Sequence, residues 1–191
     1  MKRRASHIFA KAADGWYVEP SWCSRRLFDV EDFSGGIYDP ACGWGTILNE
    51  AKAAGYKTCG SDLVDRRRSA HPGFRFKQEN FLTFEIHLVG WDVVCNPPFD
   101  FVEEFCHRAL TLGAAKVAMI MLCRRLNAAH WLRDMPLRRV WLLTPRPSMP
   151  PGDWIAAGNK PSGGTQDFCW LVFEAGTGKP VIDWLHREKN Q

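Results

Sequence analysis

Short apolar runs alternate along the chain with segments whose apolar residues recur at helical spacing. The runs predict seven strands, at residues 36–39, 56–61, 74–78, 91–95, 116–123, 139–143 and 168–174. The segments between them predict helices at residues 21–29, 46–54, 100–112 and 127–134. Strands that alternate with helices predict an α/β, Rossmann-like fold, with a mostly parallel seven-stranded sheet and helices on both faces.

Two of these elements have a clear pattern of burial. Residues 116–123 are apolar almost throughout, which is typical of a strand covered on both faces. In the helix at 100–112 the apolar residues Phe101, Phe105 and Leu112 are predicted to share one buried side. Residues 144–167 are rich in proline and glycine and predict a long loop, which in a compact domain is usually functional.

Length and composition indicate one globular domain that spans residues 1–191 and begins with an N-terminal segment and helix at 1–30. The chain has 191 residues, of which 46% are hydrophobic and 24% charged. No run reaches the ~18 apolar residues that a membrane-spanning helix needs, and the basic N-terminus precedes too short an apolar run for a signal sequence. We therefore expect a cytoplasmic protein without a membrane partner.

The seven cysteines are odd in number and include no closely spaced pair. Most of them lie inside apolar runs, which is typical of reduced, buried thiols in a reducing compartment. Zinc sites require close pairs of Cys or His, so we expect no metal site.

Positive charge is concentrated in two parts of a chain whose net charge is only +4. Residues 1–26 contain six Lys or Arg and residues 124–147 contain six Arg, whereas residues 27–123 have nine basic and thirteen acidic residues. Two basic flanks around an acidic centre suit a bound polyanion. The alternative is that the arginine clusters only form a solvated surface. These clusters are Arg66-Arg67-Arg68, Arg124-Arg125 and Arg138-Arg139.

A glycine-containing turn follows the first predicted strand. Its sequence is Asp39-Pro40-Ala41-Cys42-Gly43-Trp44-Gly45-Thr46, and its two glycines allow the backbone to approach a ligand closely. Tight packing is the alternative role for these glycines. Asp62 lies 23 residues after Asp39, at the end of the next strand, where nucleotide-binding sheets often place an acid against ribose hydroxyls. After the third strand, Asn80 and Phe81 offer an amide and a ring to a purine, although Phe81 also suits a core position.

The most specific pattern is Asn96-Pro97-Pro98-Phe99, directly after the fourth strand. Two prolines stiffen the turn and remove two backbone donors, so its carbonyls are predicted to stay free as acceptors. Asn96 adds a side-chain carbonyl and Phe99 a flat apolar face. Together they suit a planar ring that carries an exocyclic amine. The alternative is a Pro-Pro turn in which the asparagine is only a local cap.

The two blocks together resemble the class I S-adenosylmethionine-dependent methyltransferases, and specifically those that methylate adenine N6 in DNA. Tyr17-Val18-Glu19-Pro20 resembles the Tyr-x-x-Pro segment of that family, and the resemblance spans roughly residues 16–174. It implies S-adenosylmethionine as the cofactor, with Tyr17 and Pro20 near its methionine end and Asp62 at its ribose. Further cofactor-binding positions implied by the resemblance are Asp39, Pro40, Cys42, Gly43, Gly45, Asn80, Phe81 and Asn96. The implied catalytic positions, which hold the target base, are Asn96, Pro97, Pro98 and Phe99.

The resemblance implies DNA as the substrate. Within it, adenine is favoured as the target base, because cytosine N4 enzymes more often begin the second motif with Ser. An RNA base or a protein glutamine is an alternative acceptor, and a non-catalytic binding subunit is an alternative role. We expect no separate recognition domain within these 191 residues. Base readout would then come from residues 144–167, from a specificity subunit or from a homodimer, with weak sequence specificity and strong salt dependence. The loop offers Arg146, Trp154, Asn159, Lys160 and Gln166.

Overall fold

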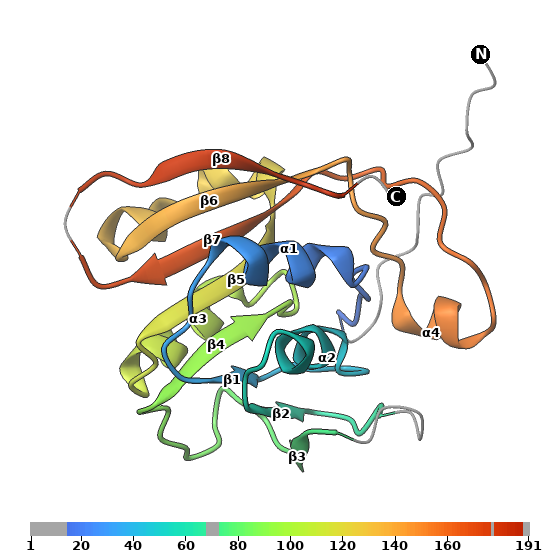
Figure 1. Ribbon diagram of the computed structural model, residues 1–191, viewed down its shortest axis with the longest axis horizontal. Helices are drawn as coiled ribbons and strands as arrows, with labels where there is room; N and C mark the ends of the chain where they lie inside the picture. Colours follow the sequence, from blue (N-terminus) through green and yellow to red (C-terminus); the bar gives the residue numbers. More distant parts are fainter. Residues whose placement is uncertain (1–14, 68–72, 177, 189–191) are drawn as a thin grey trace.

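The computed structural model describes residues 15–67, 73–176 and 178–188. Its centre is one eight-stranded sheet with the strand order β3-β2-β1-β4-β5-β7-β6-β8 (Figure 1). The strands are β1 (Gly36–Asp39), β2 (Thr58–Asp62), β3 (Arg75–Gln78), β4 (Trp91–Cys95), β5 (Lys116–Leu122), β6 (Leu137–Thr144), β7 (Phe168–Glu174) and β8 (Val181–His186). The predicted α/β architecture with a mostly parallel sheet is confirmed.

Strand direction reverses only at β7. The strands β3, β2, β1, β4 and β5 run parallel, whereas β7 is antiparallel to both of its neighbours, β5 and β6. The number of strands was predicted wrongly, because β8 adds an eighth strand that pairs in parallel with β6. Leu185 is the only residue of β8 that is buried, so this edge strand lacks the apolar run that identifies the others.

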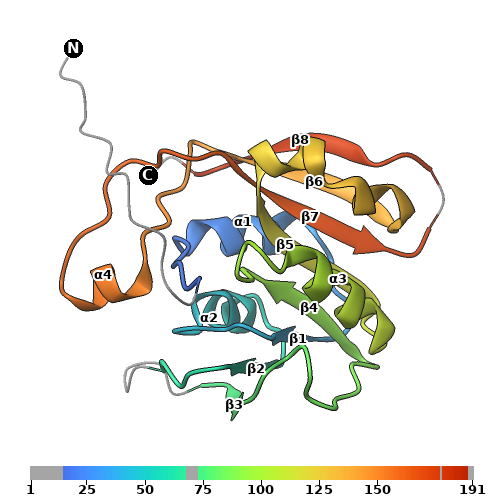
Figure 2. The ribbon, with the colours of Figure 1, turned by 180° about the vertical axis from the view of Figure 1, so that it is seen from behind.

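Helices cover both faces of the sheet, as predicted (Figures 1 and 2). The helices α1 (Trp22–Val30) and α2 (Thr46–Ala53) pack together on one face, and α3 (Val102–Thr111) covers the other. The predicted helix at 127–134 is instead two 3₁₀ helices, η1 (Cys123–Ala128) and η2 (His130–Asp134). Neither contains a buried residue, so no continuous apolar stripe supports a full α-helix there.

The core confirms one predicted pattern and corrects another. Every residue of β5 is buried, as expected for a strand with helices on both sides. The helix prediction for Phe101 was wrong, because this residue precedes α3 and its side chain is 46% exposed. Only Phe105 of the predicted apolar side is fully within the core.

All seven cysteines are free thiols. Five are buried, and the two others, Cys59 and Cys123, are partly buried. Among the described residues, no helix has the length and apolar character needed to cross a bilayer.

A buried carboxylate joins the end of α1 to the sheet. The side chain of Glu31 accepts hydrogen bonds from Lys116 Nζ at 3.1 Å and from Trp141 Nε1 at 2.8 Å. The Arg139 guanidinium forms a further, two-point contact with the same carboxylate, and Glu174 lies 3.3 Å from Lys116. This group, the Glu31 cluster, fixes α1 against β5 and β6.

The long loop at 144–167 is not without structure. It contains the short helix α4 (Gly152–Ala156), and its backbone pairs with the segment before α1. Val18 N donates to Pro150 O at 3.0 Å, and Gly152 N donates to Trp16 O at 3.1 Å. Residues 15–18 and 150–152 therefore form a small antiparallel clamp, whose central bridge joins Tyr17 and Pro151.

Candidate active site

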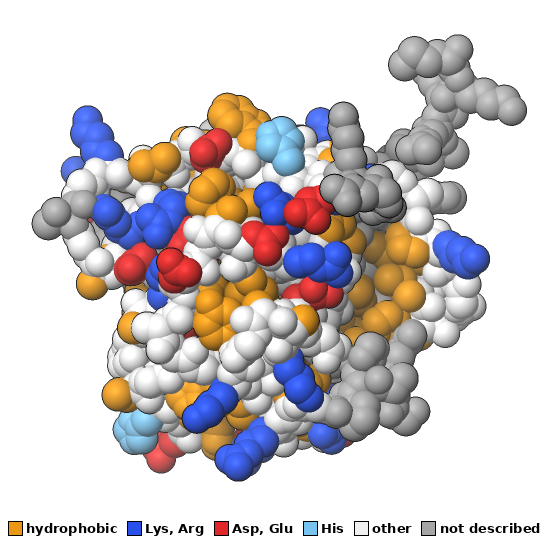
Figure 3. Space-filling model, viewed as in Figure 1, with side chains coloured by type: hydrophobic (Ala, Val, Ile, Leu, Met, Phe, Trp, Pro, Cys, Tyr) orange, Lys and Arg blue, Asp and Glu red, His pale blue; other side chains and the backbone are white. Residues whose placement is uncertain are grey.

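A cavity of about 750 Å³ opens at the carboxyl ends of β1, β2 and β4. Parallel α/β sheets usually bind ligands at this edge, and the volume lies within the roughly 300–1,000 Å³ typical of small-molecule sites. Its walls come from residues 15–19, the turns after these three strands, and the loop at 144–167. Figure 3 shows apolar side chains gathered in a recess beside the segment that carries α4.

The glycine turn forms one wall of this pocket. Gly43 has a φ of +49°, and its amide donates to Asp62 Oδ2 at 2.9 Å. A Cβ at this position would lie 2.8 Å from the indole nitrogen of Trp16. The close approach predicted for Gly43 is therefore made to Trp16 and Asp62 of the protein itself. Pro40 and Cys42 also line the pocket.

Gly45 has a different role from the predicted one. It precedes α2 with a φ of +81°, and a Cβ would lie 2.3 Å from the ring of Phe74. It does not line the pocket, so here the alternative of tight packing is correct. Pro20 likewise lies outside the pocket lining, immediately before the turn into α1.

Asp39 and Asp62 end neighbouring strands, as predicted, and both line the pocket. Asp39 is 1% exposed, and burial raises the pKa of its carboxyl well above the usual range, despite hydrogen bonds from the Cys95 thiol and the Ala41 amide. Asp62 accepts bonds from Gly43 N, from Val64 N at 3.1 Å and from Arg66 at 2.8 Å. A carboxylate has about four acceptor positions, so one remains for a hydroxyl.

The residues predicted to hold an adenine lie at the pocket but differ in exposure. Asn80 is exposed, and its Oδ1 accepts a hydrogen bond from Leu82 N at 3.0 Å. The stacking role predicted for Phe81 is not supported, because its ring is 2% exposed and packs against Tyr38 and Phe105. The core position, which was the alternative for Phe81, is the one that the structure shows.

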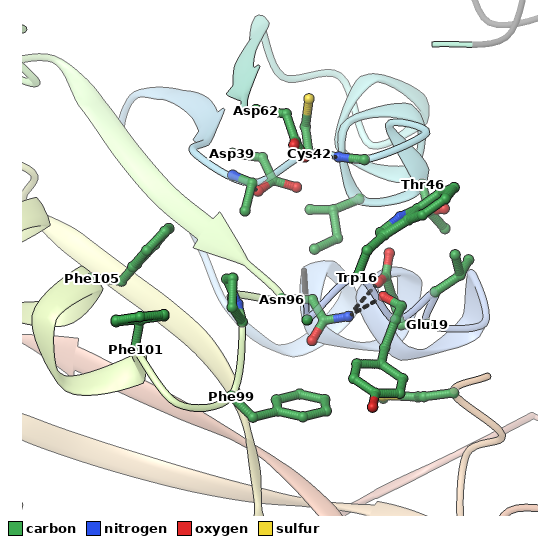
Figure 4. A pocket seen from close by; sticks show the side chains of 18 of the residues that line it. Trp16, Glu19, Asp39, Cys42, Thr46, Asp62, Asn96, Phe99, Phe101 and Phe105 are labelled. Atoms are coloured by element: carbon green, nitrogen blue, oxygen red, sulfur yellow. Dashed lines mark hydrogen bonds between the residues drawn. The ribbon is translucent and has the colours of Figure 1, made fainter. Parts of the chain in front are cut away.

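Asn96 projects from the end of β4 into the pocket (Figure 4). Its amide nitrogen donates to Tyr17 O at 2.9 Å and to Glu19 Oε2 at 2.8 Å. The opposite atom, Oδ1, is buried and has no hydrogen-bond partner. Unpaired buried acceptors are rare in folded proteins, so this oxygen identifies a place where a ligand donor would fit.

The two prolines differ from each other. Pro98 lines the pocket, but its carbonyl is not free as predicted, because it accepts a hydrogen bond from Phe101 N at 2.8 Å where the chain enters α3. Pro97 is buried and does not line the pocket. Of the predicted acceptors in this turn, Asn96 Oδ1 is the one that the geometry clearly presents to the cavity.

Phe99 lies between two other aromatic rings. The Tyr17 ring is nearly parallel to it, with centroids 5.3 Å apart and planes at 19°, and the Phe168 ring is tilted by 42° at 5.5 Å. All three residues line the pocket. They provide an apolar, aromatic wall next to Asn96.

Sequence reasoning missed several pocket residues. Glu19 was noted only as part of the Tyr-x-x-Pro segment, yet it lines the cavity and contacts Asn96, from which it is 77 residues distant. Leu63 and Phe101 line the cavity with exposures of 59% and 46%, which is unusual for large apolar side chains. The exposure of these two side chains marks them as pocket residues, but it can be recognised only in the structure and not in the sequence.

The cavity fits the group that the sequence resemblance implies. Its open acceptor at Asp62 suits a ribose hydroxyl, its exposed Leu63 and Phe101 suit an apolar ring, and Asn96 Oδ1 lacks a donor. Within the described ranges, no group of three or more His, Cys, Asp or Glu residues is arranged to hold a metal ion.

No protein-family model and no curated protein matches this sequence. The structure, however, is similar to solved methyltransferases. It superposes with a TM-score of 0.55 on a TehB-like SAM-dependent methyltransferase from Corynebacterium glutamicum, at 15% identity, covering 81% of this chain and 88% of the other. With the 23S rRNA methyltransferase ErmE the TM-score is 0.56, the identity 11%, and the coverage 88% and 72%.

A third similar structure is the type I restriction-modification methyltransferase subunit from Streptococcus thermophilus. The TM-score is 0.51 at 11% identity, and the match covers 87% of this chain and 45% of that chain. The fold is that of a Rossmann-like methyltransferase. The predicted fold class is thereby confirmed, apart from the additional strand β8.

Proposed function

We propose that this protein is an S-adenosylmethionine-dependent N-methyltransferase whose acceptor is N6 of adenine in DNA. The observation that carries the proposal is the unpaired, buried Oδ1 of Asn96 in the pocket wall, beside the ring of Phe99. An oxygen that only accepts, next to an aromatic ring, is complementary to a planar base with an exocyclic NH₂ group.

When bound, S-adenosylmethionine would supply the methyl group of its sulfonium and would leave as S-adenosylhomocysteine, and the methylated nitrogen would lose one proton to water. Tyr17, Asp39 and Gly43 would surround its methionine part, and Asp62 its ribose. Asn96 Oδ1 accepts a hydrogen bond from the target amine. Since the nitrogen becomes positively charged as the methyl group transfers, an acceptor already held in place stabilises the transition state more than the ground state. No nucleophilic side chain is needed, so Cys95 remains a buried strand residue.

A base in a duplex must leave the stack to reach this pocket, and Phe99 offers a face to receive it. The similarity to the restriction-modification subunit supports a nucleic-acid substrate. The similarity to ErmE keeps RNA as the alternative acceptor that the experiment must distinguish.

Ion pairing reduces the basic surface that the sequence suggested. Arg125 pairs with Asp100, Arg146 pairs with Asp167, and Arg139 belongs to the Glu31 cluster. Arg68 and the basic residues of the first fourteen positions lie outside the described residues. Arg124 is exposed and lines the pocket, and within the described ranges it has no ion-pair partner.

Transfer of labelled methyl groups tests the proposal. Purified protein with labelled S-adenosylmethionine should modify unmethylated DNA, and digestion should release N6-methyldeoxyadenosine. Matched RNA and a peptide with a glutamine acceptor are assayed in parallel. Label in RNA or peptide but not in DNA would contradict the proposal that DNA is the substrate. If calorimetry detects no binding of S-adenosylmethionine, the proposal of a methyltransferase that uses this cofactor is wrong.

Replacing Arg124 should weaken DNA binding in a salt-dependent way. We expect Arg124→Gln to lower affinity for a duplex at low salt by severalfold and to reduce the slope of log K against log salt by about one, because one phosphate contact is lost. The control is Arg75→Gln, an exposed residue of the edge strand β3. Fluorescence anisotropy across a salt series measures both. Equal slopes for the two variants would exclude Arg124 from the DNA-binding surface.

A further inference from the structure

Glu19 is a buried carboxylate in the wall of the pocket. The residue is 7% exposed, and it lies just before α1. Its Oε2 accepts a hydrogen bond from Asn96 Nδ2 at 2.8 Å (Figure 4). Its carboxyl also accepts one from the Thr46 hydroxyl. Within the described ranges, no lysine or arginine forms an ion pair with it. Buried carboxylates without a cation are costly, which suggests a role beyond packing.

The hydrogen bonds of the Asn96 amide fix its orientation. Both hydrogens of Nδ2 are directed at acceptors, the carbonyl of Tyr17 and the carboxylate of Glu19, so Oδ1 must face the pocket. An N–H group that donates to an anion shifts electron density within the amide toward its oxygen, and linked hydrogen bonds strengthen one another in this way. The charge of Glu19 thereby increases the negative charge on Asn96 Oδ1, the atom that faces the target amine.

We propose that Glu19 is a positioning residue that acts through Asn96: its ionised carboxylate orients and polarises the amide so that Oδ1 accepts strongly from the target amine. This inference rests on the proposed methyltransferase function. When Glu19 is protonated, the bond from Nδ2 becomes a neutral one, and Oδ1 loses part of its negative charge. Methyl transfer should therefore be faster with the ionised form.

The groups that face Glu19 come from four elements. They are Asp39 at the end of β1, Cys95 in β4, Cys23 in α1 and Thr46 in α2. None of them carries a positive charge, and burial raises the pKa of Asp39, Cys95 and Cys23 above their usual ranges. Burial also raises the pKa of Glu19 to about 7, although hydrogen bonds from its own backbone, Asn96 and Thr46 lower it. The change between its two forms thus falls near neutral pH.

The pH dependence of methyl transfer tests the proposal. In the wild-type protein, kcat should fall as pH drops through an apparent pKa near 7, from an upper plateau to a lower one about tenfold below it. Glu19→Gln fills the same space and can still accept from Asn96, but it carries no charge. We expect its profile to be flat between about pH 6 and 8, at a rate about tenfold below the wild-type plateau.

The matched control is Glu50→Gln, whose carboxylate pairs with Arg25 on the surface of α2. It should keep the wild-type rate and the wild-type pH profile. Calorimetry with S-adenosylmethionine checks that each variant binds the cofactor to within about threefold. Should Glu19→Gln keep both the wild-type plateau and its acid limb, the proposal is wrong.

A second measurement separates this inference from the proposed function, because it needs no substrate. Carbon-13 NMR of labelled glutamate carboxyls, with Glu19→Gln for assignment, should show Glu19 titrating near pH 7 in the cofactor-free protein. Asn96→Ala removes a hydrogen bond to the ionised form, so it should raise the pKa of Glu19. An unchanged pKa in Asn96→Ala would overturn the link, whereas a shifted pKa in a protein that methylates nothing would overturn the proposed function alone.

Discussion

Asn96→Ala is expected to lower kcat by about 10²–10³-fold, the typical effect of removing one prearranged polar group from an active site. The variant removes Oδ1, the unpaired acceptor, together with the two hydrogen bonds that hold it. Because the interaction strengthens as the target nitrogen becomes positive, the loss should appear in kcat more than in the Kd for S-adenosylmethionine. Single-turnover transfer and calorimetry measure the two quantities separately.

Two further variants identify the cause of the loss. Asn127→Ala, an exposed asparagine of η1, should behave as the wild type. Asn96→Asp keeps an acceptor oxygen at the same place and should retain more activity than Asn96→Ala, although it sets a second acid against Glu19. A fully active Asn96→Ala enzyme, with normal thermal melting, would remove Asn96 from the reaction.

Glu31→Ala is expected to reduce the free energy of unfolding by about 3–5 kcal/mol, the usual cost of breaking a buried ion pair from one side. The side chain of Glu31 is fully buried, and its loss leaves Lys116, Arg139 and Trp141 without their shared acceptor. Since the Glu31 cluster fixes α1 to the sheet, cofactor affinity should also fall. Urea denaturation at neutral pH gives the stability, provided that the m-value is unchanged.

The control for this variant is Asp29→Ala in the same helix. Asp29 pairs with Arg26 at an exposed site, and such pairs contribute about 0–1 kcal/mol. Equal losses of unfolding free energy in the two variants would show that the Glu31 cluster stabilises the fold no more than an exposed ion pair does.

The stabilisation by Glu31 should depend on pH. Burial alone would raise the pKa of Glu31, but hydrogen bonds from Arg139, Trp141 and Lys116 outweigh it, and the pKa is lowered. A lowered pKa in the folded state means that the stabilisation is complete above the ordinary glutamate range and is lost as pH falls through the folded-state pKa. Below that pH, wild type and Glu31→Ala should approach each other in stability.

The elements at the centre of the fold could be predicted because each is marked by residues that are neighbours in the sequence. β5 has a continuous apolar run, the end of α2 is marked by glycine, and the turn at Asn96 is marked by two prolines. β8 was missed because its single buried residue, Leu185, leaves no periodicity to recognise. The strand order β3-β2-β1-β4-β5-β7-β6-β8 was not predicted and comes from the structure, in which the carboxyl ends of β1, β2 and β4 share one edge.

The site was predictable in its motifs but not in its contacts. Asn96 and Asp62 could be identified because each ends a buried strand, but the pairing of Asn96 with Glu19 joins residues far apart in sequence. The burial of Phe81 depends on Tyr38 and Phe105, which arrive from two other elements. Such long-range packing has no periodic trace in the sequence, so the sequence left both a stacking role and a core position open for Phe81. The ligand-binding roles of Asn96 and Asp62 stay predictions.

The antiparallel clamp between residues 15–18 and 150–152 has a consequence for how a base would enter. The Tyr17 ring covers part of Phe99, and the Tyr17 backbone is tied to the proline-rich loop. A base that stacks fully on Phe99 must displace this ring, and any part of that displacement that shifts the Tyr17 backbone also shifts the loop. Entry of the acceptor and a shift of the loop at 144–167 would then be coupled.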